Sequence, residues 1–401
     1  MFSNDDINMK ALKERAFNMR WATLPQGTIP LTAADPDFQS APEIAEAIIE
    51  YTKERTFAYG PADGLQSFKN VVANTMNERR NINTRPELVL PVDSAAQGMF
   101  IIAKHCLQPG EEAIIFDPVD FLFKRSVEEA GATALLFPIN AVTGEYDIEY
   151  LRSIITNKTR LLCICNPLNP SGKVFTKEEL LQLGEIAVEY DLKIMSDEIW
   201  SDIVYDDAVY TSIASLSPQI HQRTFTVFGF SKSYGLAGLR VGYVLAPNGD
   251  EYAGLMKASL FETTAYGVST LSQAAAEAAY THCRYWVNNF VSHLTTNRNL
   301  AVDRLNKMPG ITCHKPAGCY VVFPNITGTG LSSEELTKYI LDEAKVAVVP
   351  GLEKWFGAGA EGHIRLCIAT STTILTEALD RIEVAMIRLG PNMDERHMPK
   401  N

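Results

Sequence analysis

Residues 226–242 read TVFGFSKSYGLAGLRVG, and this stretch guides the interpretation of the whole chain. The apolar runs 224–230 and 240–246 flank it and have the β-branched and aromatic content typical of strands. Between them lie Lys232 and several glycines, which permit sharp turns and close backbone approach. A lysine in a mostly apolar site has a lowered pKa and can condense with an aldehyde as a Schiff base. A solvated loop lysine is the alternative, since glycine-rich loops containing lysine are common.

The composition describes a globular protein of 401 residues with room for two domains. The net charge of -12 gives no general attraction for nucleic acid or an anionic membrane, so we expect neither partner. No signal-like segment opens the chain, and no apolar run approaches the roughly 20 residues that span a bilayer. Seven scattered cysteines without metal-ligand spacing indicate buried thiols and no metal site. We therefore expect a protein of the reducing cytoplasm.

Apolar strand-like runs alternate with helical segments through the middle of the chain. The strands are expected near 88–91, 113–116, 134–137, 160–165 and 192–196. This alternation predicts an α/β fold in which helices cover both faces of a largely parallel sheet. Ligands of such sheets bind at the carboxyl ends of the strands.

Small and polar residues follow several of these strands. VDSAAQG at 92–98 lies between a strand and a helix, where it forms either an anion-binding turn or an ordinary tight loop. NPLNPSG at 166–172 is a stiff loop that presents asparagine side chains. Asp197 directly follows a buried strand, so it should meet a cation, although a helix cap or a structural ion pair is the alternative.

The rest of the chain contains further helix and strand signals. Ser and Thr residues followed three positions later by Glu predict capping boxes at Ser40/Glu43, Thr176/Glu179 and Ser332/Glu335. Residues 272–306 predict one long helix that connects two domains, 311–323 a strand and 376–388 a terminal helix, with a loose end at 391–401. The change of pattern after the long helix indicates a second, smaller domain.

Nine motifs in order make the chain resemble a known group of enzymes. They are AADPDF, FAYGPADG, DSAAQG, NPLNPSG, SDEIW, GFSKSYGLAGLRVGY, PAGCY, VVPG and HIRLCIA. The chain resembles the fold-type I pyridoxal-phosphate enzymes, specifically the class I/II aminotransferases, with features of the cystathionine β-lyase-like C-S lyase branch. The resemblance implies a mostly parallel seven-stranded sheet flanked by helices in a large domain at 46–285. It also implies an N-terminal arm at 1–45, a smaller α+β domain at 286–401 built with both termini, and a homodimer.

The resemblance also implies residue roles. Lys232 would form the Schiff base with pyridoxal 5'-phosphate and move protons, and Asp197 would keep the pyridine nitrogen protonated. Arg365 would bind the substrate carboxylate. The other expected contacts with the cofactor are Ala95, Ala96, Phe121, Asn169, Trp200, Ser231, Arg240 and, from the neighbouring subunit, Tyr59, with Ser269 or Thr270 as a second candidate there. Asn169 and Ala34 are also expected at the substrate.

The sequence departs from the family pattern at three positions. Trp200 replaces the usual tyrosine that donates to the phenolic oxygen of the cofactor, and its indole cannot ionise. Asp120 occupies the position of the aromatic residue that stacks on the cofactor ring, so Phe121 would have to take that role. Gly229 replaces a phosphate-binding serine found in many relatives.

Three functions are compatible with these residues. An aminotransferase would exchange an amino group between an amino acid and a 2-oxo acid. Residues 241–283 contain no arginine, which disfavours acidic substrates and leaves neutral or aromatic ones, with Lys257 as a possible substitute. A C-S β-lyase that releases pyruvate and ammonia is the alternative, because residues 19–38, MRWATLPQGTIPLTAADPDF, are closer in style to that branch. A DNA-binding regulator is disfavoured, because no added domain fits before Ser40.

Overall fold

The computed structural model describes residues 2–396, with side chains to residue 390. Its largest feature is a seven-stranded sheet in the order β2 (Val89–Val92), β8 (Gly242–Leu245), β7 (Thr224–Gly229), β6 (Lys193–Asp197), β5 (Thr159–Cys165), β3 (Glu112–Asp117) and β4 (Thr133–Pro138). Neighbouring strands from β7 to β4 pair in parallel, whereas β8 is antiparallel to both β2 and β7. This confirms the predicted α/β fold with a mostly parallel sheet.

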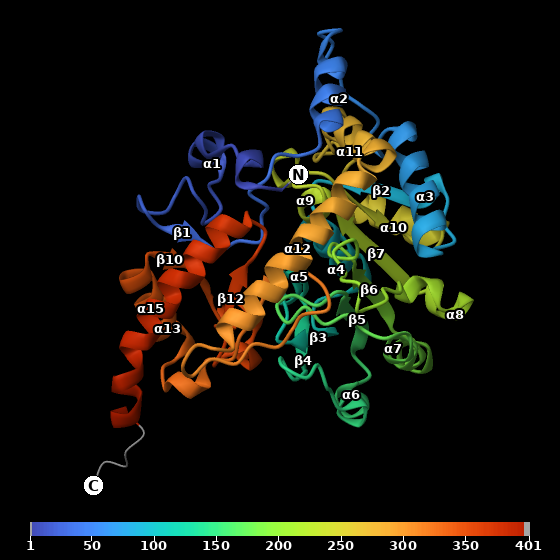
Figure 1. Ribbon diagram of the computed structural model, residues 1–401. Helices are drawn as coiled ribbons and strands as arrows, with labels where there is room; N and C mark the ends of the chain where they lie inside the picture. The colour runs from blue at the N-terminus through green and yellow to red at the C-terminus, as the bar shows by residue number, and fades with distance from the viewer. Residues whose placement is uncertain (1, 397–401) are drawn as a thin grey trace.

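Helices flank this sheet (Figure 1). They are α2 (Pro42–Thr52), α3 (Gln66–Arg80), α4 (Ala95–Cys106), α5 (Leu122–Glu129), α6 (Ile148–Ile154), α7 (Lys177–Glu189), α8 (Pro218–His221), α9 (Phe230–Ser233), α10 (Gly249–Ser259) and α11 (Thr270–His282). Helix α4 packs against β6, β7 and β8. Every residue of β7 is buried, so the chain leading to Lys232 is fixed by the core on both faces.

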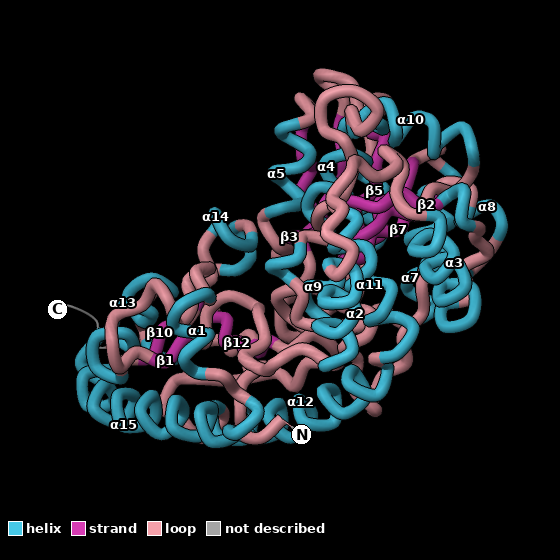
Figure 2. The backbone as a smooth tube through the Cα atoms, turned by 90° about the horizontal axis from the view of Figure 1, so that it is seen from above, coloured by secondary structure: helices cyan, strands magenta, loops and turns pink. Residues whose placement is uncertain are grey.

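Two small sheets lie apart from the large one (Figure 2). The first pairs β1 (Ile29–Pro30) in parallel with β10 (Val346–Ala347), and the second has the order β11 (Val349–Pro350), β12 (Ile364–Cys367), β9 (Val321–Val322). They lie beside the remaining helices, α1 (Met9–Arg15), α12 (Arg284–Leu305), α13 (Ser333–Ala344), α14 (Glu353–Phe356) and α15 (Thr372–Arg396). The β1–β10 pair confirms that both termini contribute to this α+β part. The boundaries at residues 45 and 285 remain a prediction.

The described structure corrects several expected elements. Helix α2 begins at Pro42, and its N-cap residue Ala41 makes no side-chain hydrogen bond, so the predicted capping box at Ser40 is wrong. The predicted capping boxes at Thr176 and Ser332 are present. The single helix over 272–306 is two helices, α11 and α12, that meet at Cys283. The strand over 311–323 is reduced to β9.

The C-terminal end also differs from the prediction. Helix α15 begins before residue 376 and continues to Arg396, so the expected loose end at 391–401 is wrong for 391–396. The last residues of that segment, 397–401, lie outside the described residues. Among the helices of the described part of the chain, none is both long and apolar enough to cross a bilayer.

Candidate active site

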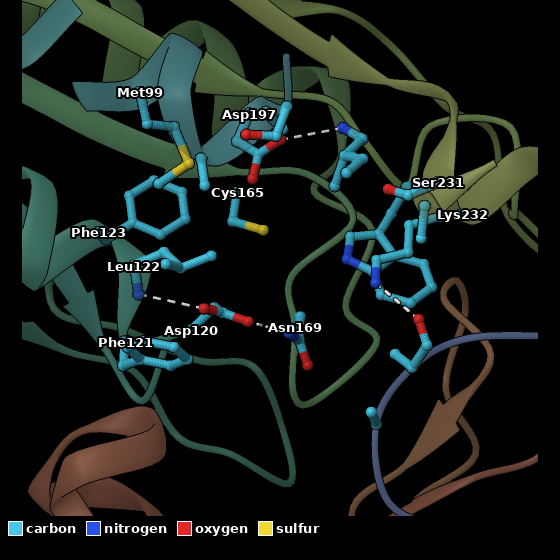
Figure 3. Close-up of a pocket in the computed structure, with 18 of the residues that line it drawn as sticks. Met99, Asp120, Phe121, Leu122, Phe123, Cys165, Asn169, Asp197, Ser231 and Lys232 are labelled. Carbon is cyan, nitrogen blue, oxygen red and sulfur yellow. Dashed lines mark hydrogen bonds between the residues drawn. The ribbon is translucent and has the colours of Figure 1, made fainter. Parts of the chain in front are cut away.

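A cavity of about 510 Å³ lies at the carboxyl ends of β5, β6 and β7, where parallel sheets bind ligands. Figure 3 shows side chains converging on it from these strands, from the loop after β3 and from the segment after β7. The expected site residues that line it are Ala34, Ala95, Ala96, Phe121, Asn169, Asp197, Trp200, Ser231, Lys232, Arg240 and Arg365. The structure therefore brings together residues that lie up to 331 positions apart in the sequence, from Ala34 to Arg365.

Lys232 lies in the short helix α9 directly after β7, and its side chain is half-buried. Its Nζ donates a hydrogen bond of 2.6 Å to the carbonyl of Ala34 and lies 5.4 Å from the ring centre of Trp200. Burial lowers the pKa of the Lys232 amine, while the nearby Asp35 opposes this shift. A lowered pKa leaves more of the amine unprotonated, which is the form that attacks a carbonyl carbon.

Asp197 ends β6 and is buried. One carboxylate oxygen accepts a hydrogen bond of 3.1 Å from the backbone N–H of Ile199. Burial raises the pKa of the Asp197 carboxyl to about 7. None of the side chains that the structure describes forms an ion pair with it, so the expected cation is not supplied by this part of the chain. A buried carboxylate without a cation fits the protonated ring nitrogen of a pyridoxal cofactor.

The turn between β2 and α4 presents the N-terminus of a helix to the cavity. The Ser94 hydroxyl caps α4 by accepting from the N–H of Gln97 at 3.1 Å, and Ala95 and Ala96 form the first turn. The first N–H groups of a helix lack carbonyl partners and bind anions. Arg240 lies at the same end of the cavity and pairs at 3.2 Å with Asp93. This set fits a phosphate group.

Arg365 in β12 reaches the cavity as a buried guanidinium. It donates from Nη1 to Oδ1 of Asn169 at 3.2 Å and from Nη2 to the carbonyl of Thr32 at 3.3 Å. Its Nε is buried without a hydrogen-bond partner, and Phe356 covers the guanidinium at 5.0 Å. Burial lowers the pKa of Arg365. An orphaned buried N–H on a fixed guanidinium fits a carboxylate ligand.

Asn169 has a second partner that the sequence did not suggest. Its Nδ2 donates to Oδ2 of Asp120 at 2.8 Å, and Asp120 also accepts from the N–H of Leu122 at 3.1 Å (Figure 3). Asn169 thus connects Asp120 with Arg365 and keeps one N–H for a ligand. The replacement of an aromatic residue by Asp120 was visible in the sequence, but this connection requires the fold.

Phe121, which follows the departure from the family pattern at Asp120, and Trp200, which is itself such a departure, both pack against a neighbouring aromatic ring. Phe121 packs edge-on against Trp355 at 5.6 Å between ring centres, and Phe123 is buried and lines the same cavity. Trp200 is buried and packs edge-on against Tyr320 at 4.6 Å. Trp355 also lines the cavity and was not expected there. The pattern in the sequence that could have indicated it is the aromatic pair 355–356, a few residues after the VVPG motif.

Tyr59 does not line the cavity of its own chain. Its side chain is 87% exposed and stands beside Tyr266 at 5.2 Å between ring centres. Of its expected companions, Ser269 is exposed, and the Thr270 hydroxyl accepts from Tyr51 at 2.5 Å. Their assignment to a neighbouring subunit stays a prediction.

Three features surround one cavity of this sheet: a lysine at the end of a parallel strand, a buried acid and the anion-binding end of a helix. Together they define the class of the protein, the pyridoxal-phosphate-dependent enzymes of fold type I. A solved structure of a PLP-bound putative aminotransferase from Clostridium difficile 630 is similar to this chain, with a TM-score of 0.86 and 27% identity, and the match covers 93% of this chain and 97% of that chain. The cofactor is pyridoxal 5'-phosphate.

The comparisons with known proteins then specify the family. The family described as "Aminotransferase class I and II" matches residues 26–382. An aspartate aminotransferase of Pyrococcus abyssi is 35% identical over 88% of this chain and 90% of its own length. The aromatic-amino-acid aminotransferase 2 of Thermococcus litoralis is 34% identical over 89% of this chain and 91% of its own length. The chain belongs to the class I and II aminotransferase family, and it is a PLP-dependent aminotransferase.

Proposed function

We propose that this aminotransferase exchanges an amino group between a neutral or aromatic amino acid and a 2-oxo acid. The observation that carries the preference is the charge of the cavity lining. Among the lining residues in the described part of the chain, the cations are Lys232, Arg240 and Arg365. The cofactor and the α-carboxylate of the substrate use all three, so a second carboxylate has no cation of its own. Lys257, the alternative cation, lies exposed on α10 and does not line the cavity.

The residue roles follow from the contacts. When bound, pyridoxal phosphate supplies an aldehyde carbon that takes up amines and a ring that accepts electrons. Lys232 would hold the cofactor through its Nζ when no substrate is present and, when free, would carry the proton of the substrate Cα–H bond on that atom. Asp197 would keep the ring nitrogen protonated, and Arg240 with the first turn of α4 would hold the phosphate.

A second group of lining residues, Arg365 and its partners, would orient the substrate. Arg365 binds the α-carboxylate through its free Nε and through the fork that Asn169 and Thr32 hold in place. A fixed carboxylate orients the Cα–H bond toward Lys232, which is how binding energy is converted into rate. Ala34 contributes through its carbonyl, which anchors the Lys232 amine at 2.6 Å.

A C-S β-lyase of the cystathionine type is the second candidate. It is favoured by the sequence of the segment 19–38, of which Met19, Ala33 and Ala34 line the cavity. The two reactions share every residue role described above and differ in the fate of a leaving group on the substrate Cβ.

One experiment separates the two candidates. The purified protein is mixed with a panel of amino acids without any oxo acid, while the cofactor spectrum and pyruvate are followed. We expect stoichiometric conversion of the cofactor to its amine form with neutral and aromatic amino acids. Catalytic release of pyruvate and thiol from cystathionine or cysteine would instead support the lyase.

The functional unit of this proposal is a cytoplasmic homodimer. Tyr59 and Tyr266 expose aromatic rings beside each other on the surface, which is the kind of side chain enriched at protein interfaces. In the dimer Tyr59 reaches the phosphate bound by the neighbouring subunit. The cytoplasmic location is supported by the seven free cysteines, since free thiols persist in a reducing compartment.

A further inference from the structure

Asp120 places a carboxylate in the wall of the cavity where the family has an aromatic ring. It follows β3 and precedes α5, and its side chain is half-buried. Oδ1 accepts from the N–H of Leu122 at 3.1 Å, and Oδ2 accepts from Nδ2 of Asn169 at 2.8 Å. Both oxygens act as acceptors, which is the bonding pattern of an ionised carboxylate.

The position of Asp120 relative to Arg365 gives this charge a consequence. Asn169 donates to Asp120 and accepts from Arg365, so the carboxylate lies two hydrogen bonds away from the guanidinium. A ligand that Arg365 binds by its α-carboxylate would therefore lie close to Asp120. In a partly buried cavity the effective dielectric constant is lower than in water, so a second carboxylate close to Asp120 would be repelled more strongly than in solution.

Among the residues that the structure describes, the cavity lining beside Asp120 and Arg365 is apolar or aromatic. It consists of Phe121, Leu122, Phe123, Trp355 and Phe356. These side chains suit an apolar or aromatic group, whereas a second carboxylate would meet apolar surface on one side and Asp120 on the other.

We infer that Asp120 is a specificity-determining residue, whose charge lowers the affinity of the cavity for substrates with a second carboxylate and so favours neutral and aromatic amino acids. The inference rests on the proposed function, because it assumes that Arg365 binds the α-carboxylate. The hydrogen bond that Asp120 accepts from the N–H of Leu122, at the start of α5, contributes to stability but does not discriminate between ligands.

The test compares two unreactive ligands of the cofactor-loaded protein. Calorimetry gives the Kd of succinate, a dicarboxylate, and of 3-phenylpropanoate, a monocarboxylate with an aromatic ring. In Asp120→Asn the ratio of the succinate Kd to the 3-phenylpropanoate Kd should fall at least tenfold, equivalent to about 1.4 kcal/mol. A ratio is used because a general loss of packing weakens both ligands alike.

Three further variants control the test. Glu128→Gln removes the same charge from an exposed position on α5 and should leave the ratio within a factor of three of the wild-type value. Asp120→Glu keeps the charge and should retain most of the selectivity. Asp120→Tyr restores an aromatic residue and should lower the ratio as Asp120→Asn does, which preserves the test if one neutral variant does not fold.

The outcomes separate this inference from the proposed function. A wild-type protein that binds succinate more tightly than 3-phenylpropanoate contradicts the proposed preference itself. A wild-type protein that prefers 3-phenylpropanoate, together with an unchanged ratio in Asp120→Asn and Asp120→Tyr, overturns the role of Asp120 alone.

Discussion

Lys232 and Asp197 carry opposite charges when ionised, and burial in one cavity shifts both toward their neutral forms. It lowers the pKa of the lysine amine and raises that of the aspartate carboxyl to about 7. The neutral amine of Lys232 can react with an aldehyde, and the Asp197 carboxylate is stabilised by a bound cationic group. One cofactor that carries both an aldehyde and a protonated ring nitrogen therefore suits both residues. This physical link makes the pair a better indicator of cofactor chemistry than either residue alone.

The first prediction concerns the stability of the cofactor-free protein. The folded state keeps the Asp197 proton up to about pH 7, whereas the unfolded chain releases it near its ordinary value of 3.8. The stabilising contribution is complete below that lower value and is lost as the pH rises through 7. At about pH 8, Asp197→Asn should therefore unfold with a free energy up to about 4 kcal/mol above that of the wild type. Urea unfolding at several pH values measures this difference.

The same experiment contains its own control. The difference in the free energy of unfolding between Asp197→Asn and the wild type should shrink by more than half when the pH is lowered to about 5. Parallel pH profiles for the wild type and Asp197→Asn would show that this carboxyl is not held in its neutral form.

The second prediction concerns Arg365. Arg365→Lys keeps the charge but loses the planar fork that Asn169 and Thr32 hold in position, so the Kd of 3-phenylpropanoate should rise by about 10- to 100-fold. Calorimetry on the cofactor-loaded protein measures this change. Arg152→Lys, at a surface ion pair with Glu189, is the matched control and should leave the Kd unchanged. An equal Kd in both variants and the wild type would remove Arg365 from the carboxylate site.

At the scale of the element, the sequence predicted what depends on local chemistry. The capping boxes at Thr176 and Ser332 form because side chain and backbone lie within one helical turn. The box at Ser40 fails because Pro42 takes the first helical position, which its fixed backbone angle favours, and Ala41 becomes the cap. The break at Cys283 contains neither glycine nor proline, so it follows from packing and had no signal in the sequence.

In the candidate site, too, some features depend on local sequence and others on tertiary structure. Motifs predicted the individual residues, and four of the motifs, DSAAQG, NPLNPSG, SDEIW and GFSKSYG, lie where β2, β5, β6 and β7 end, at the edge of the sheet where ligands bind. The connection from Asp120 through Asn169 to Arg365 joins three separate parts of the chain. Such a connection depends on the tertiary structure and could not be predicted from local sequence.

The third prediction belongs to helix α4, which lies close against the sheet at Gly98. A methyl group added there would lie 2.9 Å from Val244 and 3.2 Å from Val227. Gly98→Ala should therefore lower the free energy of unfolding by about 1–3 kcal/mol, although alanine is the better helix former. Urea unfolding checks this value. Gly249→Ala in α10, where an added methyl meets nothing within 4 Å, should not destabilise; equal effects at both positions would contradict the close packing of α4.

At the scale of the whole molecule, the proposed dimer places residues of both chains in each site. Lys232→Ala and Tyr59→Ala should each lower the activity of the homodimer. Mixed dimers of the two variants should regain up to half of the wild-type activity per dimer, because one site then combines an intact lysine with the intact tyrosine of the other chain. Light scattering gives the dimer mass, and turnover of the mixture gives the activity. Mixed dimers no more active than the parent variants would place Tyr59 outside the neighbouring site.

We propose above all that Lys232 attaches the cofactor in the cavity at the ends of β5, β6 and β7. Reduction of the purified protein with borohydride fixes any amine-bound pyridoxal phosphate, and peptide mass mapping then locates it. We expect one modified residue, Lys232, and no attached cofactor in Lys232→Ala. Attachment at another lysine, or an unmodified Lys232 in active protein, would contradict the role of Lys232.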